Sequence, residues 1–107
     1  MPTRLGDFEM LLLLTLARAG DEDPHGAVLA DLVEAETGRR VSPGAIYNAL
    51  DRLERRGCVS SSLGDPSPRR GGKRKRHYHL EPAGREAIDQ TRATLLRLVR
   101  DPVRGDT

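Results

Sequence analysis

Residues 41–57 read VSPGAIYNALDRLERRG and carry the clearest helix pattern in the chain. Ser42 is a favourable N-cap, Pro43 has the backbone angle of a first helical turn, and Gly57 is suited to end the helix. The spacing predicts a buried stripe made of Ile46, Ala49 or Leu50, and Leu53. The opposite face starts small or polar and becomes basic, and it comprises Gly44, Asn48, Asp51, Arg52 and Arg55, with Tyr47 at the flank.

Two more helices are predicted ahead of this segment. Residues 5–19 are apolar on almost every side, which indicates a helix that is buried nearly all round, in part against a second copy of the chain. Residues 20–24, GDEDP, form a turn, because Gly and Pro interrupt the pattern. Residues 25–37 then show a single apolar stripe, and Gly38 ends that second helix.

A hairpin is predicted after it. Residues 58–63, CVSSSL, have the composition of a strand. In residues 76–80, RHYHL, the side chains alternate, so Tyr78 and Leu80 share one face and His77 and His79 the other. Between them lies RRGGKRKR at residues 69–76, in which six of eight residues are Arg or Lys. The sequence therefore predicts a hairpin with a basic tip.

The last helix is expected to begin after Pro82 and to run to about Arg100. Its apolar stripe has few residues of its own domain left to cover it, so pairing with a second subunit in coiled-coil fashion is a reasonable outcome. The stripe consists of Ile88, Thr91, Leu95 and Leu98, widened by Leu96 and Val99.

This order of elements is that of a winged helix–turn–helix. The expected fold class is mainly α with a small β-hairpin (α+β). Residues 1–81 are expected to form the winged helix–turn–helix DNA-binding domain, and residues 82–107 a C-terminal dimerisation helix with a short tail.

The composition favours one globular domain. The chain has 107 residues, of which 36% are hydrophobic and 32% charged. Its one cysteine, Cys58, excludes an internal disulfide and fits a reducing cytosol. The apolar run from Met10 to Ala17 is too short to span a membrane, and no net positive segment precedes it as in a signal peptide. The expected location is the cytoplasm.

The net charge of +2 conceals a strong asymmetry along the chain. Residues 1–38 hold two basic and eight acidic side chains, a balance of −6. Residues 39–80 hold eleven basic and three acidic side chains, a balance of +8. A local excess of this size indicates a polyanionic partner for the basic segment.

Three segments in order resemble the PadR family of bacterial transcriptional regulators. They are LGDFEMLLLLTLARAG, HGAVLADLVEAETGRRVSPGAIYNALDRLERRGCVSS and GDPSPRRGGKRKRHYHLEPAGREAI, and the similarity runs from about Leu5 to Val99. The resemblance implies a homodimer in which the first and last helices pair with their counterparts. It also implies that the third helix enters the major groove of DNA and that the wing follows the flanking backbone.

The residues themselves fit this role. A helix N-terminus suits phosphate, Asn48 can pair with adenine, and Arg52 can reach phosphate one turn further on. The expected DNA-binding residues are Ser42, Pro43, Gly44, Tyr47, Asn48, Arg52, Arg69, Arg70, Lys73, Arg74, Lys75 and Arg76. The expected dimer-interface residues are Phe8, Leu12, Ile88, Thr91, Leu95, Leu98 and Val99.

Three aromatic positions have competing interpretations. Tyr47 lies next to the apolar stripe, so burial in the domain competes with DNA contact. Tyr78 is expected in the core. Phe8 is expected in the core or at the dimer interface.

Metal binding and catalysis find little support. His77, His79 and Cys58 could supply three zinc ligands, yet no carboxylate or further cysteine is placed to complete the set, and the neighbouring positive charge opposes a cation. The sequence holds no nucleophile–base constellation and no GxxxxGK phosphate loop. The expectation is a protein with no metal, no cofactor and no enzymatic activity.

The expected function is a homodimeric transcription factor, most simply a repressor, which binds a roughly palindromic double-stranded DNA operator. The resemblance to the PadR family adds a small-molecule effector that releases the DNA. Two alternatives remain open. The basic wing suits an RNA-binding module or a winged-helix module that docks an acidic protein. The near absence of aromatic residues disfavours readers of single-stranded RNA.

Overall fold

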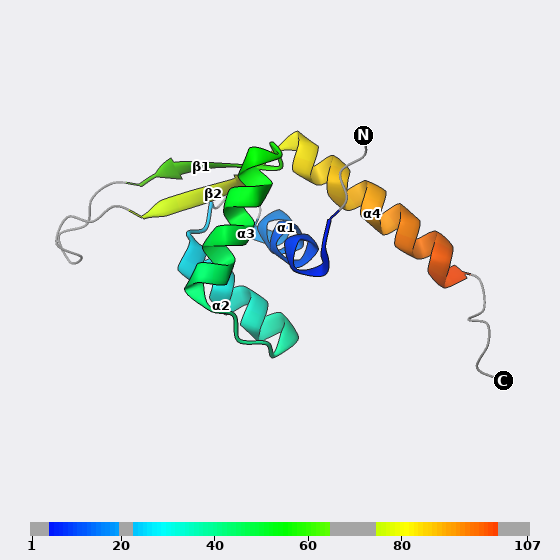
Figure 1. Ribbon diagram of the computed structural model, residues 1–107, viewed down its shortest axis with the longest axis horizontal. Coiled ribbons are helices and arrows are strands. Elements are labelled where there is room, and N and C mark those ends of the chain that lie inside the picture. Colours follow the sequence, from blue (N-terminus) through cyan, green and yellow to red (C-terminus); the bar gives the residue numbers. More distant parts are fainter. Residues whose placement is uncertain (1–4, 20–22, 65–74, 101–107) are drawn as a thin grey trace.

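The computed structural model describes residues 5–19, 23–64 and 75–100, and its elements follow the order expected from the sequence (Figure 1). The helices and strands are α1 (Asp7–Ala19), α2 (Gly26–Thr37), α3 (Pro43–Arg55), β1 (Val59–Leu63), β2 (Arg76–Leu80) and α4 (Pro82–Arg100). The mainly α fold with one small hairpin is therefore confirmed.

Helix α3 begins and ends as its sequence predicts. The Ser42 side chain accepts a hydrogen bond from the Ala45 backbone N–H at 3.2 Å, and Pro43 occupies the first turn. At the other end Gly57 adopts a left-handed φ of 76°. The Cys58 N–H then donates to the Leu53 carbonyl at 2.9 Å. This closing turn uses Cys58, so β1 starts at Val59, one residue later than the strand composition suggests.

One apolar core joins the first three helices, the hairpin and the start of α4. Tyr78 is 1% exposed within it, which confirms its expected place in the core. Leu12 is fully buried there as well, and this corrects its expected place at a dimer interface, because the protomer itself covers the side chain. The buried set is Leu12, Leu13, Leu16, Leu29, Val33, Ile46, Ala49, Leu50, Leu53, Cys58, Val59, Tyr78, Ala87 and Ile88.

The hairpin is antiparallel, with Val59 opposite Leu80 and Leu63 opposite Arg76. It is fixed to the connection between α1 and α2, because the Tyr78 N–H donates to the Pro24 carbonyl at 2.9 Å. This bond places the base of the wing beside the first turn of α2 and next to α3 (Figure 1).

The two halves of α4 differ in burial. Gly84, Ala87 and Ile88 are buried near its start, and a Cβ at Gly84 would collide with the Cys58 carbonyl, so glycine permits this close approach. From Arg92 onward every residue of the helix is exposed, and this half extends away from the rest of the molecule (Figure 1). None of the helices in the described ranges is long and apolar enough to cross a membrane.

Candidate DNA-binding surface

The outward face of α3 presents one continuous line of residues. Gly44, Asn48, Asp51 and Arg55 follow at intervals of three or four, which places them on one side of the helix, and all four are exposed. A Cβ built on Gly44 meets no described atom within 4 Å, so the first turn of this face is open. The line combines an amide, a carboxylate and a guanidinium, which are the groups that read base edges in the major groove.

Ser42 and Pro43 stand just ahead of this line, and both are exposed. The Ser42 oxygen accepts the bond that caps α3, and its hydroxyl hydrogen remains able to donate. Together with the free N–H groups of the first turn, this hydroxyl makes the start of α3 suitable for a phosphate.

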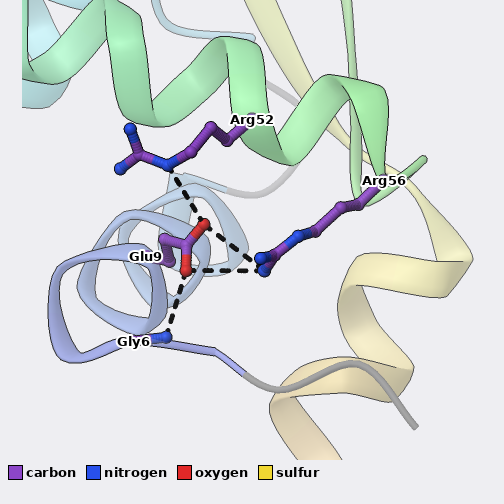
Figure 2. A network of polar contacts seen from close by, with 4 residues as sticks. All are labelled: Gly6, Glu9, Arg52 and Arg56. Carbon is purple, nitrogen blue, oxygen red and sulfur yellow. Dashed lines mark hydrogen bonds and ion pairs between the residues drawn. The ribbon is translucent and has the colours of Figure 1, made fainter. Parts of the chain in front are cut away.

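The flank of α3 that faces α1 is bound to a buried carboxylate (Figure 2). Glu9 Oε2 lies 3.7 Å from Arg52 Nε and 3.4 Å from Arg56 Nη1. Glu9 Oε1 accepts from the Gly6 N–H at 3.1 Å and from Arg56 Nη1 at 3.5 Å. Arg52, expected to contact phosphate, is thus paired with Glu9 and half exposed.

The flank that faces the wing carries Tyr47 and Glu54. The Tyr47 ring packs against Gly26 at the start of α2 so closely that any side chain there would collide with it, yet Tyr47 remains 42% exposed. Ser61 of β1 donates to Glu54 Oε2 at 2.9 Å, and Arg76 Nη1 donates to the Ser61 oxygen at 2.9 Å. This chain of bonds holds the Arg76 guanidinium on the wing beside α3.

All three histidines of the chain lie at the base of the wing. His77 Nδ1 is 2.7 Å from the Asp23 backbone oxygen, and His79 Nδ1 is 3.1 Å from Asp23 Oδ1. The His25 and His77 rings meet edge to face at 5.8 Å, and Lys75 Nζ is 3.3 Å from His25 Nε2. These contacts join β2 to the segment between α1 and α2.

One carboxylate does lie near these rings, because Asp23 Oδ1 contacts His79 from 56 positions away in the sequence, whereas the His77 contact is to the Asp23 backbone oxygen. Cys58 lies in the core instead. Its burial raises the pKa of the thiol above the ordinary value, against an opposing effect of the Arg56 charge. Within the described ranges no group of three or more His, Cys, Asp or Glu side chains could hold a metal ion.

Four expected wing residues, Arg69, Arg70, Lys73 and Arg74, lie outside the described residues. Sequence reasoning left out three exposed arginines close to α3. Arg55 completes the outward line, and Arg39 and Arg40 follow Gly38, whose left-handed φ of 70° turns the chain towards the start of α3. The helical spacing alone was a sufficient signal for Arg55.

The expected interface residues other than Leu12 fall into three groups by burial. Ile88 is buried, whereas Phe8 and Thr91 are half-buried. Leu95, Leu98 and Val99 are 52%, 70% and 77% exposed.

A separate apolar groove of about 770 Å³ runs between α1 and α2, and its walls include Leu11, Leu14, Val28 and Leu32.

Comparison with known proteins agrees with this geometry. The model of the "Transcriptional regulator PadR-like family" matches residues 13–90. The chain belongs to the PadR-like family of transcriptional regulators. It is 36% identical over 92 residues to "Transcriptional regulator Rv3488" of Mycobacterium tuberculosis, a match that covers 86% of this chain and 81% of that protein.

Two further comparisons extend the result. The chain is 36% identical over 95 residues to an uncharacterized 37.1 kDa protein in transposon TN4556 of Streptomyces fradiae; the match covers 89% of this chain but only 25% of that relative. The crystal structure of a PadR family transcription regulator from Clostridium difficile superposes with a TM-score of 0.69 at 20% identity, over 89% of this chain and 93% of that one. The winged-helix fold is thereby confirmed, and the family match together with the Mycobacterium tuberculosis relative confirms a role in transcription regulation.

Proposed function

We propose that this PadR-like chain acts in the cytoplasm as a homodimeric repressor that binds a palindromic operator. Helix α3 enters the major groove, and the wing follows the flanking phosphates. The observation that carries the proposal is the outward line of α3, because its exposed amide, carboxylate and guanidinium lie on one face with an open first turn. Ser42 precedes this line, Tyr47 lies on its wing-facing flank, and Arg76 is held beside α3 through Ser61 and Glu54. Lys75 on the wing lies beside His25.

The exposed stripe of α4 supports the proposed dimer. Its second half carries Leu95, Leu98 and Val99 on the surface, and a helix of this kind is stabilised when a second copy covers the stripe. Residues 1–81 then act as the DNA-binding domain, and residues 82–107 hold the two domains together. Two-fold symmetry places one α3 in each half-site, which accounts for a palindromic operator.

Release by a small-molecule effector is a further part of the proposal. The groove between α1 and α2 supports it, because apolar walls suit a ligand and Asp23, His25 and His77 at the base of the wing line the same groove. A ligand bound there would touch the contacts that set the wing position. An effector should therefore lower the affinity of the protein for the operator. It should also compete with a fluorescent apolar probe for the groove.

The test is a titration of fluorescently labelled intergenic DNA from upstream of the gene, at several salt concentrations, with scrambled duplex as competitor. If each subunit neutralises about three phosphates, the slope of log affinity against log salt should be roughly −5. Replacing Lys73, Arg74 and Lys75 by alanine should flatten this slope by about half or more. Arg85→Ala, an exposed arginine at the start of α4, is the matched control and should leave it unchanged.

The outcomes separate the alternatives. Two chains per site with strong preference over scrambled duplex would support the repressor. Equal, weak binding to every duplex would contradict it. Preference for RNA over DNA would instead support an RNA-binding module. A 1:1 complex with an acidic protein would support a protein-interaction module.

A further inference from the structure

Asp51 is an acid in the middle of the surface proposed to approach DNA. It lies between Asn48 and Arg55 on the outward line of α3, and its side chain is exposed. Across the described residues its carboxylate has no ion pair. The other acid of this helix, Glu54, accepts hydrogen bonds from Ser61 instead. Asp51 therefore remains available to a partner outside the chain.

Electrostatics limits what that partner can be. A carboxylate is repelled by phosphate, and by the O6, N7 and O4 acceptors that guanine and thymine present in the major groove. Adenine offers an amino group, but its N7 acceptor lies directly beside it. The cytosine N4 amino group has an acceptor on one side only, the O6 of the paired guanine, whereas the adenine amino group lies between its own N7 and the O4 of thymine. Cytosine is therefore the base edge that best fits a carboxylate.

We propose that Asp51 is a specificity-determining residue that accepts a hydrogen bond from the N4 amino group of one cytosine in each half-site. The proposal rests on the proposed function, since it requires α3 to enter the major groove. Asn48 and Arg55 on either side carry the groups that pair with adenine and guanine, so the three residues read neighbouring positions.

This role predicts effects of opposite sign on two kinds of binding. Removal of one negative charge at about 7 Å from a phosphate should raise affinity for non-specific DNA about threefold per subunit. Loss of the acceptor should reduce discrimination at one position of each half-site about tenfold. If Asp51 only paired with Arg55 along the helix, its removal would change base preference at no position, because such pairs contribute mainly to helix stability.

The experiment is a selection of bound sequences from randomised duplex, run with the full wild-type chain and with Asp51→Ala, Asp51→Asn and Asp31→Ala. Asp31 is an exposed acid on α2 and serves as the charge-matched control. Circular dichroism verifies that each variant is folded. Wild type and Asp31→Ala should select cytosine at one position per half-site, and Asp51→Ala should lose that preference alone. Asp51→Asn should shift it towards adenine, which an amide pairs with bidentately.

Two results would overturn the inference, and they differ from each other. A wild-type consensus that Asp51→Ala retains at every position would remove Asp51 from base recognition while leaving the proposed function intact. The same holds if the altered position is an A·T pair in the wild-type site, because cytosine is then on neither strand. A wild-type chain that enriches no sequence above the starting pool would contradict the proposed function and this inference together.

Discussion

Helices α3 and α4 show the same apolar periodicity, but the stripe of α3 is buried and most of the stripe of α4 is exposed. In α3 the stripe residues Ile46, Leu50 and Leu53 are fully buried by the chain's own first two helices and hairpin. In the second half of α4 the stripe residues Leu95 and Leu98 remain 52% and 70% exposed. Periodicity thus shows that a helix has a face to bury, but the number of elements left in the chain decides whether the same chain can bury it.

Truncation of a buried stripe residue in α3 should destabilise the fold far more than truncation of an exposed one in α4. Leu50 is fully buried, so Leu50→Ala leaves a cavity that solvent does not reach. The substitution should lower the free energy of unfolding by about 3 kcal/mol. Urea denaturation followed by circular dichroism measures this change. Leu98→Ala is the control on α4, where truncation at low protein concentration should cost less than about 0.5 kcal/mol. Equal losses in the two variants would contradict the difference between the helices.

The second prediction tests what covers α4. Leu95→Glu together with Leu98→Glu places unpaired charges on the stripe, and this should weaken self-association more than about 100-fold. Sedimentation equilibrium should then report the mass of one chain, while circular dichroism shows that the helical fold persists. Gln90→Glu, an exposed change on the same helix, should leave the dimer intact. A double variant that stays dimeric would place the interface elsewhere.

The third prediction concerns the contact that orients α3 on α1. Glu9→Gln keeps the volume of the side chain but removes the charge shared by Arg52 and Arg56, and it should lower the free energy of unfolding by about 1–2 kcal/mol. Glu36→Gln breaks the exposed pair with Arg18 and should cost less than about 0.5 kcal/mol. Urea titration of both variants checks this order, and a larger loss for Glu36→Gln would reverse it.

These predictions also show what could be inferred from the sequence. The bounds and stripe of α3 were predictable, because the Ser42 cap, Pro43 and the spacing of the apolar residues all act within one helix. The outward line to Arg55 was equally readable from helical spacing. The fold class followed from the order of such local patterns.

Contacts between distant segments were not predictable. Glu9 and Arg56 are 47 positions apart, and Asp23 and His79 are 56 apart, so no spacing rule connects them. The burial of Leu12 was missed for a related reason. Helix α1 is apolar nearly all round, and a pattern without a polar face cannot show which side meets the core and which meets a partner.

The smallest expected effect is a dependence on pH at the end of α3. Burial raises the pKa of Cys58 in the folded chain, so the thiol stays protonated there after the unfolded chain has begun to ionise above its ordinary value of about 8.5. The stabilisation is complete below that value and is lost as the pH rises towards the folded pKa. The loss cannot exceed about 1.4 kcal/mol per pH unit.

The urea midpoint should therefore fall more between pH 7.5 and pH 9.5 for the wild-type chain than for Cys58→Ala. This window ends below the ordinary tyrosine pKa of about 10, so the buried Tyr78 phenol, whose pKa burial also raises, contributes little to the difference. An equal decline in both proteins would assign the alkaline instability to another group. The difference between the two proteins therefore reports the titration of Cys58, the buried residue that follows the end of α3.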